Sequence, residues 1–444
     1  MSSDTAAQPR MILTCFPHSI TATGDDHIGS ANIALHYLCQ MSQRAILYVI
    51  VVLSVVSAGI SGSLFSTYLP IIAAEMSGGA ATKQDVATMG SYAGASFLIG
   101  WAVGAFVLGA VSDRIGRKLA LFAAICTCSL GVFCTAFVPS LPFLVAIRFL
   151  TGAGAGGILL IGSVLISEAW AQGNRVRMVS IMMNSFPLGF LVAGVIGSAV
   201  KDWHLAYTMG SSTIVLGLAV LFLVRESDVW KGSDQRHEAA HLERENVFDA
   251  RYRRDLVLGI TLFGSMLIGL WAAFTWMPTW VHSMSSPEDA QHNRGMVSIV
   301  LGIGSMAGAL VGAPLANRIG RRRTVFVGYA ACAALSVATF QTGLVPSPAL
   351  FVMIFLLTAA IGINQGVLST YIPELFPTLI RGAATGISMN AGRLLTAVGV
   401  FFVGVLVHVL DGYHNAIAAF AIAYVLGAIA LAFARETNGQ ALPE

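Results

Sequence analysis

Long apolar runs recur along this chain and limit its possible folds more than any other feature. A helix needs about 20 apolar residues to cross the hydrocarbon core of a bilayer. Twelve segments meet this requirement, at residues 45–74, 88–110, 119–138, 142–166, 177–199, 205–224, 256–280, 296–316, 324–343, 349–372, 383–407 and 414–434. We therefore predict an all-α membrane protein with twelve transmembrane helices.

The composition supports a membrane protein and excludes several other classes. Hydrophobic residues make up 56% of the chain and charged residues 11%, whereas a soluble domain carries about 25% charged residues. The net charge of +3 is small, with the basic residues scattered over short loops, so no nucleic-acid partner is expected. The six cysteines show no metal-ligand spacing, and we expect neither a metal nor another cofactor.

One charged segment, 225–255, divides the helices six and six. We predict five parts: a disordered cytoplasmic tail (1–43), a six-helix bundle (44–225), a cytoplasmic central loop (226–255), a second six-helix bundle (256–435) and a short cytoplasmic tail (436–444). With both termini in the cytoplasm, three of the 25 Lys and Arg residues (Lys83, Lys201 and Arg294) fall outside, two lie within helices, and the other 20 lie inside. The positive-inside rule thus predicts cytoplasmic termini.

The two predicted bundles repeat a pattern of charges and glycines. The stretch GAVSDRIGRK at 109–118 is echoed by GAPLANRIGRR at 312–322, so that Gly116 and Gly320 are 204 positions apart. In the same way, Glu168 precedes Arg175 by seven positions, as Glu374 precedes Arg381. Such parallel repeats are typical of transporters whose two halves surround a site near the middle of the membrane.

These motifs resemble those of the major facilitator superfamily. GAVSDRIGRK resembles the signature between its helices 2 and 3, and RFLTGAGAGG at 148–157 resembles its helix 4 motif. The endings RESDVW and RETNGQAL are similar to those of sugar porters and organic-acid symporters, and SEAW and NAGR are most similar to the sialate and aromatic-acid symporter branches. The resemblance implies two pseudo-symmetric bundles that work by alternating access.

We expect the repeated charges to form a cytoplasmic charge lock, which closes that side when the protein faces outward and breaks when it faces inward. Plain positive-inside loops are the alternative. The second copy carries Asn317 in place of Asp113 and so loses a formal charge. The predicted members of the charge lock are Gly109, Asp113, Arg114, Gly116, Arg117, Glu168, Arg175, Arg318, Arg321, Glu374 and Arg381.

Two arginines, Arg148 and Arg393, fall within predicted helices, whereas no Asp or Glu lies deep in any of them. An unpaired charge in the bilayer is costly, and a guanidinium can hold a carboxylate with two hydrogen bonds. We therefore predict an anionic substrate bound by Arg393, near the midplane, with Asn390 on the same helix face. Packing is an equally good explanation for Arg148.

Other candidate substrate contacts lie on helices 1, 7 and 10, which line the cavity in the superfamily. Mid-helix amides face a wet cavity or another helix rather than lipid. The aromatic candidates could instead be packing residues. These candidates are Tyr68, Trp271, Trp276, Asn364 and Gln365.

We therefore predict a secondary transporter in the cell membrane, surrounded by lipid and working as a monomer. It would move a small organic anion (a monocarboxylate, aromatic acid or sialic acid) together with a proton. A sugar or polyol porter, or a uniporter without protons, is the alternative. A drug antiporter is less favoured because helix 5 reads SFPLGFLVAGVIG, without a clean antiporter motif. Nothing indicates an enzyme, since no nucleophile triad, metal cluster or phosphate loop is present.

Overall fold

The computed structural model describes residues 26–170, 172–231, 247–343 and 345–439. Within them, twelve helical spans are long and apolar enough to cross a membrane. Nine are formed by a single uninterrupted helix, namely α14 (Arg381–Val409) and eight others. The eight others are α1 (Asp26–Met76), α2 (Lys83–Ile115), α3 (Arg117–Thr135), α4 (Leu141–Ala169), α10 (Ala250–Met284), α11 (Ala290–Ile319), α12 (Arg321–Gln341) and α13 (Pro348–Glu374).

The remaining three spans are interrupted. The fifth span is divided into α5 (Gln172–Met183) and α6 (Phe186–Ala199), the sixth into α7 (Trp203–Ser211) and α8 (Ile214–Leu223), and the twelfth into α15 (Tyr413–Ala419), α16 (Ala421–Ala430) and a short 3-10 turn (Leu431–Phe433). Pro187 lies in the first turn of α6. Since proline has no amide hydrogen and clashes with the preceding turn, it explains the first of these breaks.

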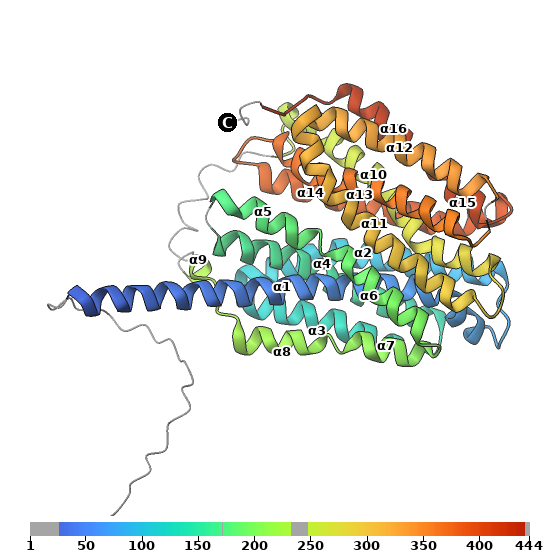
Figure 1. Cartoon of the computed structure of the whole chain (residues 1–444), viewed down its shortest axis with the longest axis horizontal. Coiled ribbons are helices and arrows are strands. Elements are labelled where there is room, and N and C mark those ends of the chain that lie inside the picture. Colours follow the sequence, from blue (N-terminus) through green and yellow to red (C-terminus); the bar gives the residue numbers. More distant parts are fainter. Residues whose placement is uncertain (1–25, 171, 232–246, 344, 440–444) are drawn as a thin grey trace, which may run out of the picture.

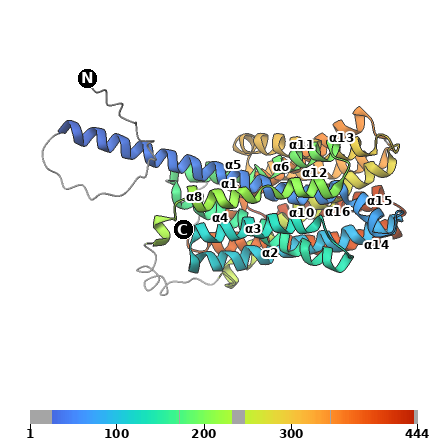
Figure 2. The ribbon, with the colours of Figure 1, turned by 90° about the horizontal axis from the view of Figure 1, so that it is seen from below.

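The spans form two halves that lie side by side, blue to green for the first and yellow to red for the second (Figure 1). Both chain ends of the described structure lie at one end of the molecule, called here the terminal end (Figure 1). At this end α1 runs beyond the bundles (Figure 2). The opposite end is called the distal end, and the positive-inside pattern predicts that it faces the outside.

Three predicted boundaries differ from the structure. Residues 26–43, expected to be a disordered tail, are the first part of α1, and the rest of that tail lies outside the described residues. The central loop contains the short helix α9 (Asp228–Lys231), and α10 begins at Ala250, inside the predicted loop. Residues 232–246 lie outside the description.

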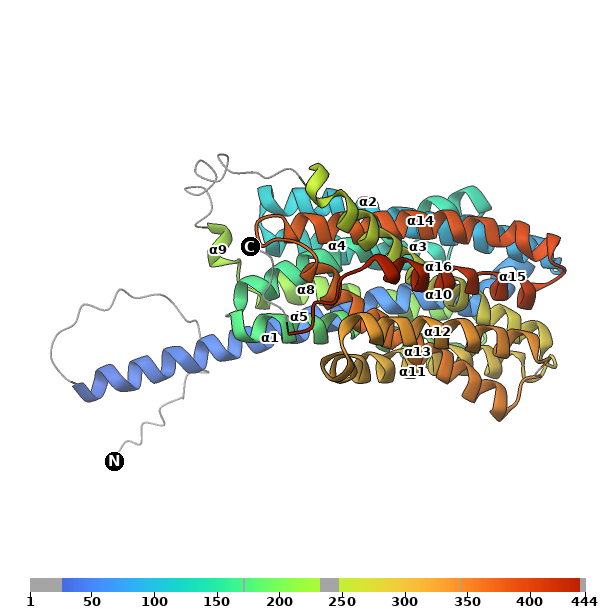
Figure 3. The same cartoon turned by 90° about the horizontal axis from the view of Figure 1, so that it is seen from above.

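The two halves contact each other through α6 with α11 and through α2 with α14. The second pair runs side by side along the molecule (Figure 3). Hydrogen bonds between the halves, as far as the described residues show, lie toward the distal end and join Thr67 to Ser298, Gln291 to Ser198, Gly404 to Ser91 and Tyr413 to Lys83. A Cβ on Gly194 would lie 2.6 Å from the Gly295 oxygen. Because neither Gly194 nor Gly295 has a side chain, α6 and α11 touch at this point. The distal side of this structure is therefore closed.

Candidate functional site

Arg393 lies on α14 beside the other half of the molecule. Its Nη1 donates to Asn390 Oδ1 at 3.2 Å, as the shared helix face predicts. Its guanidinium carbon lies 5.2 Å from the centre of the Trp101 ring on α2 and 5.8 Å from that of Phe263 on α10. A cation over an aromatic face is attracted by the ring quadrupole, and most strongly by Trp. The half-buried Arg393 is thereby held at the boundary between the halves.

Trp101 belongs to an aromatic cluster made by both halves. The cluster comprises Phe97 and Trp101 on α2, Phe186 on α6 and Trp271 on α10, with neighbouring ring centres 5.3–6.1 Å apart. Edge-to-face and offset ring pairs at such distances are favourable beyond their buried area. The sequence predicted a role for Trp271 but missed the other three, because nothing in their spacing distinguishes them from other apolar positions.

Arg148 lies on the far side of this cluster and differs in its surroundings. Its side chain is only 2% exposed, lies between the Phe65 and Phe97 rings at 4.6 and 4.3 Å, and donates from Nη1 to the Ser61 oxygen at 2.9 Å. Its Nε has no described partner. Since Phe97 separates it from Trp101, the geometry favours a packing role over direct substrate contact.

The other predicted contact residues do not join the cluster. Tyr68 is fully buried and donates to the Val200 oxygen at 2.7 Å. Trp276 is fully buried and stacks on Tyr413. Asn364 is buried against α12, where its Nδ2 lies 3.5 Å from Cys332 Sγ, and Gln365 is half-buried. The structure therefore brings together Arg393, Asn390 and Trp271 but places Tyr68, Trp276 and Asn364 elsewhere.

The electrostatics of the centre match the expectation from sequence. In the described spans, acidic side chains lie only near helix ends, among them Glu75, Glu168 and Glu374. The ion pairs of the described residues include neither Arg393 nor Arg148. The centre therefore carries positive charge without a carboxylate of its own, and an anion would complement it.

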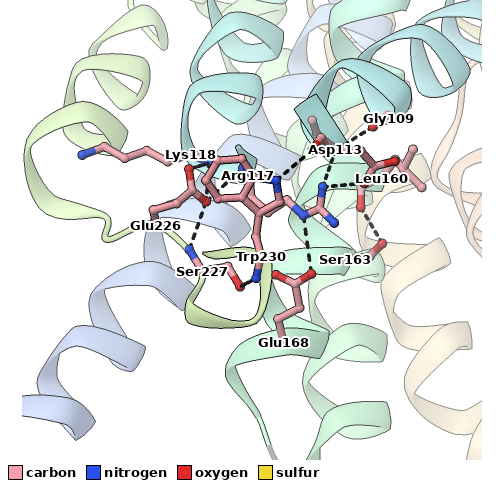
Figure 4. A network of polar contacts seen from close by, with 11 residues as sticks. Gly109, Asp113, Arg117, Lys118, Leu160, Ser163, Glu168, Glu226, Ser227 and Trp230 are labelled. Atoms are coloured by element: carbon pink, nitrogen blue, oxygen red, sulfur yellow. Dashed lines mark hydrogen bonds and ion pairs between the residues drawn. The ribbon is translucent and has the colours of Figure 1, made fainter. Parts of the chain in front are cut away.

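The first predicted charge cluster is formed at the terminal end (Figure 4). Arg117 Nη1 lies 2.6 Å from Asp113 Oδ1, and Arg117 Nε lies 3.4 Å from Glu168 Oε1. The pair with Asp113 links the start of α3 to the end of α2, and the pair with Glu168 links it to the end of α4. One guanidinium thus holds three helix ends together.

Glu226, which is not among the predicted members of the charge lock, completes this cluster. Its Oε1 accepts from the backbone nitrogens of Arg117 at 2.9 Å and Lys118 at 3.2 Å. The carboxylate thereby caps α3, whose first amides have no partner within the helix. Trp230 Nε1 donates to the backbone oxygen of Asp113 at 2.9 Å (Figure 4). The RESDVW ending therefore binds back onto the motif between α2 and α3.

Gly116 makes this cap possible. Its φ of 97° and ψ of 158° lie in a region that is essentially restricted to glycine. A Cβ at this position would lie 2.3 Å from Glu226 Oε2. The glycine therefore turns the chain sharply from α2 to α3 and leaves room for the capping carboxylate.

The second half repeats this arrangement. Gly320 has φ 97° and ψ 156°, and Glu436 Oε1 accepts from the Arg321 nitrogen at 2.8 Å. Arg321 lies 2.6 Å from Asn317 Oδ1 and 3.5 Å from Glu374 Oε1. The RETNG ending thus caps α12 as RESDVW caps α3, and the predicted tail from 436 is bound as far as Asn438. Asn317 supplies a hydrogen bond where Asp113 supplies a charge.

The remaining predicted members of the charge lock are less tightly bound. Ser112 Oγ donates to the Gly109 oxygen, Arg114 and Arg318 are exposed, and Arg381 Nε donates to the Phe376 oxygen. Exposed Arg175 lines a cavity of about 310 Å³ beside Ser163, Ser167 and Glu168.

Both clusters lie within a single half. Arg117 contacts Asp113, Glu168 and Glu226, and Arg321 contacts Asn317, Glu374 and Glu436, so no described ion pair of either arginine crosses between the halves. Both charge clusters are intact in this structure, in which the described hydrogen bonds between the halves lie toward the distal end. The pairs observed here therefore hold each half together, and a lock between the halves stays a prediction.

Comparison with known proteins identifies the class. The family model described as Major Facilitator Superfamily matches residues 51–400 and, in a second match, residues 293–443. Two solved structures of xylose transporters show the same fold. The D-xylose-proton symporter has a TM-score of 0.71 at 18% identity, over 89% of this chain and 99% of that one, and inward-open XylE from E. coli has a TM-score of 0.71 at 18% identity, over 89% and 97%. The chain is a member of the major facilitator superfamily and an integral membrane transporter rather than an enzyme.

Several curated relatives are similar over most of their length. The "Probable 4-methylmuconolactone transporter" of Cupriavidus pinatubonensis is 29% identical, over 81% of this chain and 84% of the relative. The gentisate transporter of Corynebacterium glutamicum is 26% identical, over 78% of each chain. The niacin transporter NiaP of Acinetobacter baylyi is 25% identical, over 78% of this chain and 84% of the relative.

Proposed function

We propose that this protein is a secondary transporter for a small organic acid with an aromatic or otherwise unsaturated carbon skeleton. The observation that carries the proposal is Arg393, a cation without an acidic partner that lies over the Trp101 ring at the boundary between the halves. In this arrangement Arg393 binds the substrate carboxylate with charge-assisted hydrogen bonds. The aromatic cluster contacts the flat part of the substrate.

The relatives support this substrate class. Their names give a muconolactone, gentisate and niacin as substrates, and a further relative is a cis,cis-muconate transport protein, 25% identical over 70% of this chain. All four are small unsaturated compounds, and gentisate, niacin and muconate carry carboxyl groups. A site with one strong cation and several aromatic rings suits such molecules better than a sugar, which needs many hydrogen-bond partners.

Proton symport is part of the proposal. The described spans offer no free carboxyl group near Arg393. At the distal end, Glu75 accepts from Trp203 Nε1 at 2.6 Å and lies 3.1 Å from His204 Nε2, so it is already bound. We therefore infer that the transported proton is carried on the carboxyl group of the substrate rather than on an acidic side chain of the protein. Uniport of the anion is the alternative.

The proposal places the terminal end in the cytoplasm, as the positive-inside rule indicates, and the monomer in the cell membrane. We infer that the central site opens toward the cytoplasm in this state, because the described hydrogen bonds between the halves lie toward the distal end. Closure of the terminal end in the outward-facing state would bring together the Arg and Glu side chains of both halves there, including Arg175 and Arg381.

Uptake into proteoliposomes tests this function. We would offer benzoate, gentisate, nicotinate, lactate, sialic acid and glucose, each with and without an inward proton gradient. The proposal predicts uptake of the aromatic acids, driven above equilibrium by the gradient. Uptake of the acids that does not depend on the proton gradient would indicate a uniporter. Uptake of glucose alone would contradict the proposal and indicate a sugar porter.

A further inference from the structure

A third arginine, Arg294, is buried between the halves at the distal end. The charge pattern of the sequence predicts that Arg294 lies outside the membrane, but it lies in the first turns of α11 and is 3% exposed. Its guanidinium carbon lies 5.2 Å from the centre of the Tyr68 ring on α1. This cation therefore lies at the contact between the two halves, well away from Arg393.

The guanidinium of Arg294 has no polar partner among the described residues. Its Nε is buried without a hydrogen bond. On the neighbouring helix α10, Thr279 Oγ1 and His282 Nδ1 are also buried and unpartnered. Thr279 and His282 are three positions apart and so lie on one face of α10, and His282 is close enough to Arg294 for their charges to interact. Two unpartnered polar atoms, Thr279 Oγ1 and His282 Nδ1, thus lie on the helix that packs beside α11 and Arg294.

Three acids at this end of the molecule are bound by other groups. Glu75 is held by Trp203 and His204, and Asp202 accepts from the His204 nitrogen at 2.9 Å. Asp289, which precedes α11, accepts from Ser286 Oγ at 2.8 Å. A buried cation without a counter-ion is costly, and an anion would relieve this cost.

The contact between Arg294 and Tyr68 depends on the closed distal side. Thr67, the neighbour of Tyr68, shares a 2.8 Å hydrogen bond with Ser298, which lies one helical turn after Arg294. Tyr68 is fixed to its own half because its hydroxyl donates to the Val200 oxygen at 2.7 Å. When the halves separate at this end, the ring must leave the guanidinium and expose Arg294 to the outside.

We propose that Arg294, with Thr279 and His282, forms an outer subsite that binds an anion when the distal side is open. Its occupant is the carboxylate of the incoming substrate, so this proposal rests on the proposed function and extends it. Arg294 receives the substrate at the outer opening, and Arg393 receives it at the centre. Tyr68 covers the subsite after the distal side has closed.

The test compares Arg294→Gln, Arg294→Lys and the exposed distal control Lys201→Gln by uptake of external benzoate. The proposal predicts that Arg294→Gln raises KM by about tenfold or more, as expected for loss of a charged hydrogen bond. Arg294→Lys keeps the charge and should recover most of the affinity, and Lys201→Gln should behave as the unchanged protein. An unchanged KM, or a lowered kcat alone, in Arg294→Gln would overturn the proposal and leave Arg294 a packing residue.

Anion binding by the purified protein separates this test from that of the proposed function. Sodium benzoate and sodium chloride are titrated separately, with gluconate as the balancing anion, while thermal unfolding is followed by Trp fluorescence. Stabilisation by benzoate that Arg294→Gln reduces supports the substrate subsite even if none of the offered acids is transported. Stabilisation by chloride alone would identify an inorganic anion site and overturn the assignment to substrate. Equal stabilisation of the unchanged protein and of Arg294→Gln by benzoate would show that Arg294 does not bind the anion.

Discussion

A methyl group at Gly116 should destabilise the first half of the transporter through two separable effects. The backbone conformation there, φ 97° and ψ 158°, costs a residue with a side chain about 1–3 kcal/mol. The added Cβ would also lie 2.3 Å from Glu226 Oε2 and displace the carboxylate that caps α3. Because hydrogen bonds to charged groups contribute about 1.5–3 kcal/mol and water replaces part of this at a half-exposed site, we assign about 1–2 kcal/mol to the displaced cap.

A double-mutant cycle distinguishes the two effects. Gly116→Ala should cost about 3 kcal/mol when Glu226 is present, and about 1–2 kcal/mol less when Glu226 is already replaced by Ala, since only the backbone strain then remains. Unfolding in mixed micelles titrated with SDS gives the free energies. An equal cost of Gly116→Ala in both backgrounds would refute the proposed contact between this glycine and the capping carboxylate.

Three further predictions follow from the same contacts. Asn317→Asp restores the charge of the first copy beside Arg321 and should stabilise the protein by no more than about 1 kcal/mol, as measured by the same unfolding titration. Arg148→Met should leave the KM for benzoate within about twofold, because Arg148 packs between the Phe65 and Phe97 rings rather than at the central site; a large rise in KM would make Arg148 a substrate contact. Trp101→Leu should raise that KM by roughly two- to thirtyfold, the range that a cation–π contact of about 0.5–2 kcal/mol allows, and should affect acetate less than benzoate.

The sequence predicted the helices well because simple constraints determine them. The bilayer requires long apolar helices, and all twelve appear in the structure. The repeated spacing of Gly116 and Arg117 with Gly320 and Arg321 predicted similar turns in both halves, and both glycines have φ 97°.

Side-chain directions were harder to predict, because they depend on how each helix is rotated against its neighbours. Asn364 and Gln365 are adjacent, yet Asn364 is buried against Cys332 while Gln365 is half-buried. Hydropathy also placed Arg294 outside the membrane, since it could not show that Tyr68 covers this side chain. The capping by Glu226 and Glu436 joins residues more than 100 positions apart, and only the folded chain brings them together.

Binding of benzoate to the purified protein, to Arg393→Gln and to Arg393→Lys tests the central claim most directly. Trp101 lies beside Arg393, so quenching of Trp fluorescence offers a signal at the site. We expect Arg393→Gln to weaken binding by ten- to a hundredfold, the equivalent of about 1.5–3 kcal/mol for a charge-assisted contact, and Arg393→Lys to weaken it less. If Arg393→Gln is folded and binds benzoate with unchanged affinity, Arg393 does not hold the substrate carboxylate and the account of the central site is wrong.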